Sequence, residues 1–308
     1  MTIQDFEDAF PQGTFDDIVR NPLPDSTTRV VNINYPSNYR SAIHYFRAIM
    51  NAKEYSERAL KLTDYLLQLN AANYTVWQYR RDILVKLGMD KQIECDWIRK
   101  MSESNPKNYQ IWYHRQWCLE NEKEIENVIE ELNHLADHAF NDDNKNYHAW
   151  SYRQWILKNF NVSSDQELDF VEKMIDLDVR NNSAWNHRFF ILTRDESVNW
   201  ENELAYVWKK INLAPNNEAP YVYLAGICDK FKSAENSEII KNALKTALEM
   251  EATFPKTIPL LTFIVETSRQ HNLMSKEELF KRIECLATEI DPIRSNYWEY
   301  VKMIYNGK

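Results

Sequence analysis

An internal repeat of about 35 residues is the feature that most constrains how this chain can fold. Four blocks place an Asn, a Trp four residues later and an Arg three residues after that, at residues 73–80, 108–115, 146–153 and 181–188. The steps between Trp77, Trp112, Trp150 and Trp185 are 35, 38 and 35 residues. Weaker matches extend the register to both ends, at Asn38, Asn216, Pro259 and Trp298. A period of this length is typical of helical-repeat proteins.

Each period contains two helical patterns separated by a short polar turn. Apolar residues recur at helix spacing over residues 55–69 and again over 74–87. The recurring Asn, here Asn73, suits an N-cap, because its side-chain oxygen can accept from the first backbone N–H groups of a helix. We therefore predict an all-α fold, an α–α superhelix of about seven helical-hairpin pairs that forms a crescent-shaped solenoid over residues 37–308.

The Trp and the Arg of each block lie on nearly the same face of the second helix. The Trp can lock one repeat against the next, and the Arg can stack on a ring or pair with a carboxylate between repeats. These residues are predicted to build the repeat rather than to carry chemistry. Residues 1–36 differ, because four prolines interrupt any helical period. They predict an extended N-terminal arm, in which residues 15–18 either dock on a partner or stay loose.

The composition of the chain argues against several classes of protein function. The chain has only 4 glycines and no GxGxxG or P-loop pattern, which excludes a glycine-rich phosphate loop. A net charge of −9 disfavours binding to nucleic acid, and no apolar run is long enough to span a membrane. The four cysteines match no zinc or disulfide spacing, and the first residues show no signal-peptide pattern. We expect a cytoplasmic protein.

The histidines offer one arrangement that could bind a metal. His134 and His138 stand four residues apart, so both can point from one face of a helix. No matched third ligand appears in the sequence, so we predict a solvated face and no metal site in this chain. Since no complete catalytic apparatus is visible, the chain is expected to act beside another chain.

One edge of the predicted solenoid combines cations and aromatic rings. The residue before the cap Asn is Ala72, Lys107, Lys145, Arg180 and then Pro215. The residue after the cap Asn is Tyr74, Tyr109, Tyr147 and then Asn182. Both rows stand at helix N-termini, whose partial positive charge favours anions. The rows are consistent with a phosphate or carboxylate site, or with ordinary solvated side chains at turns.

The residues that surround these positions resemble the repeat motifs of a known protein family. Residues 106–112 (PKNYQIW) and 145–150 (KNYHAW) are similar to the signature repeats of protein prenyltransferase α subunits, and residues 45–48, 70–77 and 178–186 fit the same pattern. The resemblance runs from about residue 29 to about residue 230, and more loosely to the end. Within the family, it is closest to the α subunit shared by farnesyltransferase and geranylgeranyltransferase type I.

The resemblance implies one half of a heterodimeric enzyme, active only with a β subunit around which the α subunit wraps. Such an enzyme transfers a farnesyl or geranylgeranyl group from its diphosphate to a C-terminal cysteine of CaaX proteins, such as small GTPases, and forms a thioether. The family implies a zinc ion held by the β subunit rather than by this chain, and admits magnesium.

The family's functional residues map onto matching positions here. The resemblance implies that Lys107 and Tyr147 are catalytic, at the isoprenoid diphosphate. It also implies that Asn146 and His148 help to bind that diphosphate. Peptide contacts are implied for three further residues, Gln110 at the C-terminal carboxylate, and Tyr74 and Tyr109 in the wall of the site.

Two other functions fit the repeat. One is the α subunit of the Rab-type geranylgeranyltransferase, whose repeats are related but less like these. The other is a non-catalytic helical-repeat binding scaffold, which would bind without turnover and would give Lys107 no special role. The specific fillers around Lys107 and Tyr147 favour the CaaX-type enzyme over both.

Overall fold

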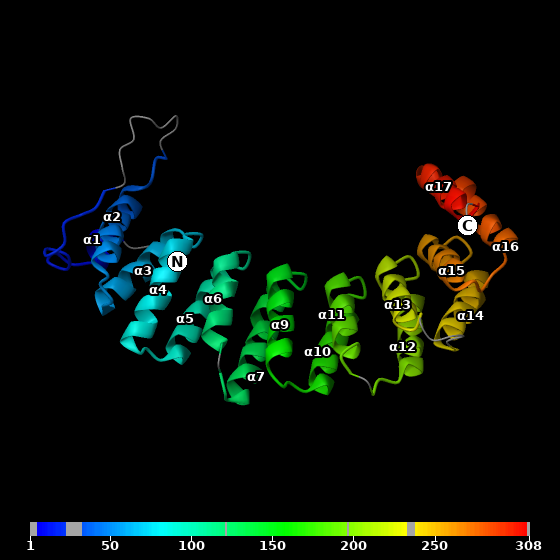
Figure 1. Ribbon diagram of the computed structural model, residues 1–308, viewed down its shortest axis with the longest axis horizontal. Helices are drawn as coiled ribbons and strands as arrows, with labels where there is room; N and C mark the ends of the chain where they lie inside the picture. Colours follow the sequence, from blue (N-terminus) through cyan, green and yellow to red (C-terminus); the bar gives the residue numbers. More distant parts are fainter. Residues whose placement is uncertain (1–4, 23–32, 121, 196, 233–237, 307–308) are drawn as a thin grey trace. The chain divides into compact units, whose positions relative to one another are not determined.

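The computed structural model describes residues 5–22, 33–120, 122–195, 197–232 and 238–306 (Figure 1). Helices are the regular structure of these ranges, which contain no β-strand, so the predicted all-α class is confirmed. Across the same ranges, no helix combines the length and the apolar character needed to cross a membrane. The chain divides into two compact units, residues 1–161 and 162–308.

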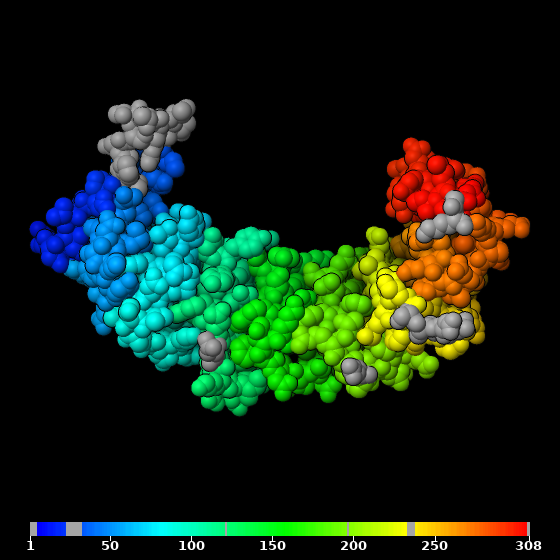
Figure 2. Space-filling model, in the orientation of Figure 1, coloured from blue at the N-terminus to red at the C-terminus, as the bar shows by residue number. Residues whose placement is uncertain are grey.

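The first unit is a row of helices arranged as successive hairpins. Its elements are α1 (Phe6–Ala9), α2 (Ser37–Ala52), α3 (Glu57–Leu69), α4 (Tyr74–Leu87), α5 (Lys91–Ser104), α6 (Tyr109–Leu119), α7 (Ile125–His134), the π-helical turn η1 (Leu135–Ala139), α8 (Phe140–Asp142) and α9 (Tyr147–Asn159). Helices α3 and α4 pair as a hairpin, α5 pairs with α6, and η1 packs on α9. In the space-filling view of this unit, bands of colour follow one another in chain order, so successive repeats are in direct contact (Figure 2).

The second unit continues the same construction. Its elements are α10 (Ser164–Leu177), α11 (Asn182–Leu192), α12 (Trp200–Leu213), α13 (Glu218–Lys230), α14 (Glu238–Thr253), α15 (Ile258–His271), α16 (Lys276–Cys285), η2 (Leu286–Ile290), η3 (Pro292–Arg294) and α17 (Ser295–Asn306). They pair as the hairpins α10–α11, α12–α13, α14–α15 and α16–α17. With the three hairpins of the first unit, the described residues hold the seven pairs that the period predicts.

A turn of constant length joins the two helices of six hairpins. The first helix ends, and one C-cap residue, two turn residues and one N-cap residue follow, at 70–73, 105–108, 143–146, 178–181, 214–217 and 254–257. The N–H of the N-cap residue donates to the C-cap carbonyl over 2.9–3.2 Å in each case. In five of the turns the N-cap is Asn, and its side-chain oxygen accepts from the first turn of the second helix, as predicted.

The Trp of each block closes this turn. The indole Nε1 of Trp77, Trp112, Trp150 and Trp185 donates over 2.8–2.9 Å to the carbonyl of the first turn residue. The fifth block corrects the sequence register, because its N-cap is Asn217 and not Asn216. Tyr221, rather than Pro220, therefore takes the Trp position, and its hydroxyl donates to the Pro215 carbonyl over 3.0 Å.

The Arg of three blocks forms a buried ion pair with the next repeat, and two of these guanidinium groups also lie over a ring, Arg80 over Trp97 at 3.8 Å and Arg188 over Tyr206 at 4.0 Å, so both predicted roles are confirmed. The pairs are Arg80 with Glu94, Arg115 with Glu131 and Arg188 with Glu203, at 2.6–2.7 Å. Each Glu stands on the first helix of the following hairpin and also accepts from that hairpin's second helix, namely from His114, Tyr152 and Tyr223. Each carboxylate thus joins three helices, and burial in low dielectric makes that join costly to break.

The N-terminal residues 5–18 are folded onto α2 and α3 instead of extended. Phe6–Ala9 form a helical turn, and the rings of Phe10 and Phe15 are buried. Phe15 stacks on Tyr45 of α2 at a centroid distance of 4.7 Å, and Arg58 of α3 pairs with Asp17 at 2.7 Å. Burial of these rings outweighs the lack of helical period. The remaining described arm residues, 19–22 and 33–36, adopt no helix, and residues 1–4 and 23–32 lie outside the described ranges.

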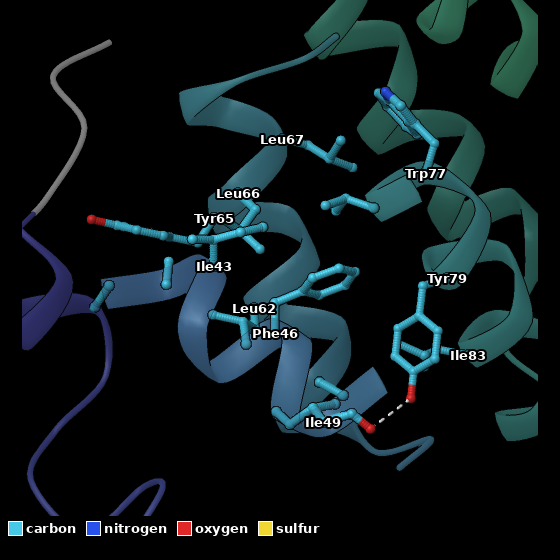
Figure 3. Packing of buried hydrophobic residues seen from close by; sticks show 14 of the residues in the cluster. Ile43, Phe46, Ile49, Leu62, Tyr65, Leu66, Leu67, Trp77, Tyr79 and Ile83 are labelled. Atoms are coloured by element: carbon cyan, nitrogen blue, oxygen red, sulfur yellow. Dashed lines mark hydrogen bonds between the residues drawn. The ribbon is translucent and has the colours of Figure 1, made fainter. Parts of the chain in front are cut away.

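The same rings join the apolar core of α2, α3 and α4, which Figure 3 shows from close by. Phe46 and Leu62 lie between the helices, with Trp77 at one end and Tyr79 at the other. The Tyr79 hydroxyl lies 2.7 Å from the Glu54 carbonyl and 3.2 Å from the Ile49 carbonyl, so this buried ring also satisfies a backbone acceptor at the end of α2 (Figure 3).

Candidate functional site

Three exposed tyrosines mark the N-termini of neighbouring second helices in the first unit. Tyr74, Tyr109 and Tyr147 are the first residues of α4, α6 and α9, and each side chain is at least 69% exposed. Helix α6 packs against both α4 and α9, so the three N-termini follow one another along one edge (Figure 1). We call these residues the tyrosine edge. Large rings left in solvent at a helix N-terminus are available to contact another molecule.

Lys107 stands beside the tyrosine edge, in the turn that leads into α6. Its side chain is 74% exposed, and Nζ lies 3.1 Å from Oδ2 of Asp143. Asp143 is the C-cap residue of the following turn, so the pair spans the gap between the N-termini of α6 and α9. The hydrogen bond from Lys107 holds the pKa of the Asp143 carboxyl below its usual value. An exposed ammonium at a helix N-terminus is an electropositive point suited to a phosphate group.

Asn146 is buried, with 3% of its surface exposed, and both ends of its amide are occupied. The Oδ1 atom accepts from the backbone N–H groups of His148 and Ala149, at 2.9 and 3.3 Å. The Nδ2 atom donates to the Pro106 carbonyl over 3.0 Å, and so fixes the turn of Lys107 against α9. This arrangement favours a positioning role over the direct diphosphate contact that the resemblance implies.

His148 lies half-buried between two rings of the preceding repeat. Its imidazole meets the edge of the Tyr109 ring at a centroid distance of 4.4 Å and lies parallel to Trp112 at 6.4 Å. Burial, and then the nearby Lys107 charge, lower the pKa of His148 below its ordinary value. The ring is therefore neutral at neutral pH, and it can offer one N–H to an anion without adding a charge.

The predicted residues fall into two groups. Lys107, Tyr109, Asn146, Tyr147 and His148 come together around the turns before α6 and α9. Gln110 is half-buried in the first turn of α6 beside them, and Tyr74 stands one repeat away on α4. Sequence reasoning missed Asp143. Its signal was the Asn or Asp that begins the turns at 70, 105, 143 and 178.

Comparisons with known proteins show which family the repeats and the fold match. The model of the protein prenyltransferase alpha subunit repeat matches residues 56–87, 92–122, 129–160 and 164–195, which hold one block each. The solved structure of Candida albicans protein geranylgeranyltransferase-I complexed with GGPP superposes with a TM-score of 0.84 at 31% identity. That alignment covers 96% of this chain and 99% of the matched chain.

Curated relatives extend the match beyond the repeats. The protein farnesyltransferase/geranylgeranyltransferase type-1 subunit alpha of Schizosaccharomyces pombe is 38% identical, over 92% of this chain and 92% of its own. The Dictyostelium discoideum subunit of the same name is 35% identical, over 87% and 85%. The geranylgeranyl transferase type-2 subunit alpha of Saccharomyces cerevisiae matches over only 51% of each chain. The chain belongs to the family of protein farnesyltransferase/geranylgeranyltransferase type-1 α subunits.

Proposed function

We propose that this chain supplies the diphosphate-facing half of a CaaX prenyltransferase site, which a β subunit completes. The reaction is transfer of an isoprenoid from its diphosphate to the cysteine of a protein C-terminus. Family membership supports the transferase role. The exposed Lys107 between two helix N-termini supports the assignment of the diphosphate contacts to this chain. The chain would work in the cytoplasm, on CaaX proteins such as small GTPases.

The chemistry needs a cation at the leaving group. The cysteine sulfur attacks C1 of the isoprenoid, a C–S bond forms, and the C1–O bond breaks with its electron pair leaving on the diphosphate. Negative charge therefore grows on the diphosphate oxygens as the reaction proceeds, and fixed positive groups there lower the barrier. Zinc, which we expect the β subunit to hold, would supply the cysteine as a thiolate.

We assign to Lys107 the role of stabilising the negative charge that grows on the diphosphate. Its ammonium is a compact, strongly hydrated donor on a flexible stem, and its exposure leaves it free to turn from Asp143 towards a diphosphate. The N-terminus of α6 adds partial positive charge in the same place. Tyr147 would donate its hydroxyl to the same group, and neutral His148 would donate one N–H. Magnesium stays a prediction for this step.

We assign the peptide contacts to Gln110 and to two rings of the tyrosine edge. Gln110, one residue into α6 from Tyr109, would donate its amide to the C-terminal carboxylate of the CaaX peptide. Tyr109 and Tyr74 would form the wall along which the peptide lies, because their rings are exposed at adjoining helix N-termini. The length of the isoprenoid is a property that we assign to the β subunit.

The observation that carries this proposal is the exposed Lys107 ammonium, and substitution of that residue tests it. The chain is co-expressed with a β subunit of this enzyme class, as wild type, Lys107→Ala and Lys145→Ala. Lys145 is a matched control, because it occupies the same turn position one repeat later and is also exposed. Transfer of both isoprenoids is measured on CaaX peptides ending in Leu or Ser.

We expect kcat of Lys107→Ala to fall about a hundredfold or more, as for loss of one group that stabilises charge in a transition state. Lys145→Ala should retain most of the wild-type rate, with both heterodimers intact by gel filtration. Normal turnover of Lys107→Ala in an intact heterodimer would disprove the assignment and leave the chain a scaffold. Failure of the wild type to assemble with any CaaX-type β subunit would favour the Rab-type or plain scaffold functions.

A further inference from the structure

Three potential metal ligands, none of them among the residues assigned above, meet on the surface of the first unit. They are Glu103 in the last turn of α5, His134 at the end of α7, and His138 in the π-helical turn η1. Oε1 of Glu103 lies 3.6 Å from Nε2 of His134 and 3.8 Å from Nδ1 of His138. All three ligand atoms lie within 4.8 Å of one another, and among the described residues this is the group that could hold a metal ion.

Packing between repeats brings these residues together. Helices α5 and α7 are the first helices of successive repeats, and Arg99 of α5 ties them by pairing with Glu130 and Glu131 at 2.8 Å. The two imidazoles stack at a centroid distance of 4.5 Å across the start of the π turn. Single π turns inside α-helices are rare and are frequently found at functional sites. The sequence showed the two histidines, but Glu103 is one repeat away and gave no signal.

We propose that Glu103, His134 and His138 bind a divalent transition metal of the zinc class. Two imidazoles and one carboxylate are a donor set that suits zinc and its neighbours, with remaining positions left to water. Metal–ligand distances of about 2.0–2.2 Å place tetrahedral ligands about 3.4 Å apart. Two of the three separations exceed that value by only 0.2–0.4 Å, so small rotations of the exposed Glu103 and His138 side chains towards the largely buried His134 would close the site.

The electrostatics of the group permit a cation. The positive charges of Arg99 and Arg115 are balanced, because Glu131 pairs with both and Glu130 pairs with Arg99. The Glu103 carboxylate faces both imidazoles and adds a negative charge beside them.

One rearrangement accompanies binding. Nδ1 of His134 accepts from Nη2 of Arg115 over 3.4 Å, a long contact that places the ring proton on Nε2, towards Glu103. A metal on Nε2 requires the other neutral tautomer, in which this proton lies on Nδ1. A hydrogen bond of that length is weak, so its loss opposes metal binding only slightly.

The test compares Zn²⁺ binding by the full-length chain with that of three variants. His138→Gln and Glu103→Gln each remove one exposed ligand, so neither is expected to disturb the fold. Asp137→Asn is the control, because it removes one exposed carboxylate beside His138 that is not in the group. Each protein is stripped with a chelator and titrated with Zn²⁺ against a chromophoric competitor, and its melting temperature is measured with and without the ion.

We expect one Zn²⁺ site in the wild type and in Asp137→Asn. The affinity for Zn²⁺ should be at least about tenfold weaker in His138→Gln and in Glu103→Gln, because loss of even an outer partner of a metal ligand typically lowers metal affinity about 10–100-fold. Zn²⁺ should raise the melting temperature of the wild type and not that of His138→Gln. Equal binding by the wild type and His138→Gln would overturn the proposal. So would equal loss in Asp137→Asn, which would indicate unspecific attraction of cations to the acidic surface.

Discussion

Replacing Glu131 by Gln removes the charge at the centre of one inter-repeat join while keeping the size of the side chain. Glu131 accepts from Arg99, from two nitrogens of Arg115 and from the Tyr152 hydroxyl, at 2.6–2.9 Å. Burial alone would raise the pKa of this carboxyl, but the two guanidinium groups outweigh it and lower the pKa to about 2. The substitution leaves two arginines in the interior without that partner.

The magnitude follows from the pKa. A carboxyl whose pKa falls from 4.5 to about 2 on folding contributes about 3 kcal/mol of stability at neutral pH. Removal of one partner from a buried ion pair costs about 3–5 kcal/mol in other proteins, which agrees. Because the folded-state pKa is depressed, this stability is fully present above pH 4.5 and is lost as the pH falls towards 2.

The assay is urea unfolding of the full-length chain, followed by tryptophan fluorescence at several pH values. Glu130→Gln is the matched control, because Glu130 is the neighbouring residue, is 58% exposed and pairs with Arg99 only at the surface. It should cost about 1 kcal/mol or less. The difference between the wild type and Glu131→Gln should shrink on acidification. Equal losses in the two variants, or a Glu131→Gln loss that does not change with pH, would refute the reasoning.

Two further predictions concern the turns. Tyr221→Phe removes the hydrogen bond to the Pro215 carbonyl and should lower stability by about 1 kcal/mol in urea unfolding; a wild-type midpoint would show that the ring alone closes this turn. Asp143→Asn frees Lys107 from its ion pair while keeping the side-chain oxygen that accepts from the Lys145 N–H. In Asp143→Asn, binding of an isoprenoid diphosphate to the heterodimer should tighten by up to about fivefold, as expected for loss of an exposed ion pair. The gain should vanish in a Lys107→Ala background. Weaker binding by Asp143→Asn would contradict competition between Asp143 and the substrate for Lys107.

The parts of the fold that follow local rules were predictable from the sequence. The Asn caps, the Trp one turn later and the 3.6-residue period are all set within a dozen residues, so the helices at Glu57–Leu69 and Tyr74–Leu87 lie where the pattern places them. The capping pattern did not predict the N-cap of the fifth block correctly. Asn216 and Asn217 are adjacent and either can cap a helix, so only packing decides between them.

The features that depend on contacts between repeats were not predictable. An Arg in each block indicated a carboxylate partner, but nothing local distinguished Glu131 from the exposed Glu130 beside it. The N-terminal phenylalanines carried no helical period, and only their burial against Tyr45 gives them a fixed place.

The candidate site divides in the same way. The exposure of Lys107 and of the tyrosine edge agrees with a row of side chains at helix N-termini. The burial of Asn146 and the ion pair with Asp143 depend on how one turn meets the next, which spacing alone does not fix.

The carbonyl of Pro106 accepts two hydrogen bonds, one from Trp112 of its own repeat and one from Asn146 of the next. The carbonyl of Val179 does the same with Trp185 and Asn217. A residue inserted into such a turn would break both bonds at once, so evolution can lengthen these repeats only outside the turn. The longest step between block tryptophans, 38 residues, fits this rule, because that repeat contains the π-helical turn Leu135–Ala139 and its turn keeps the common length.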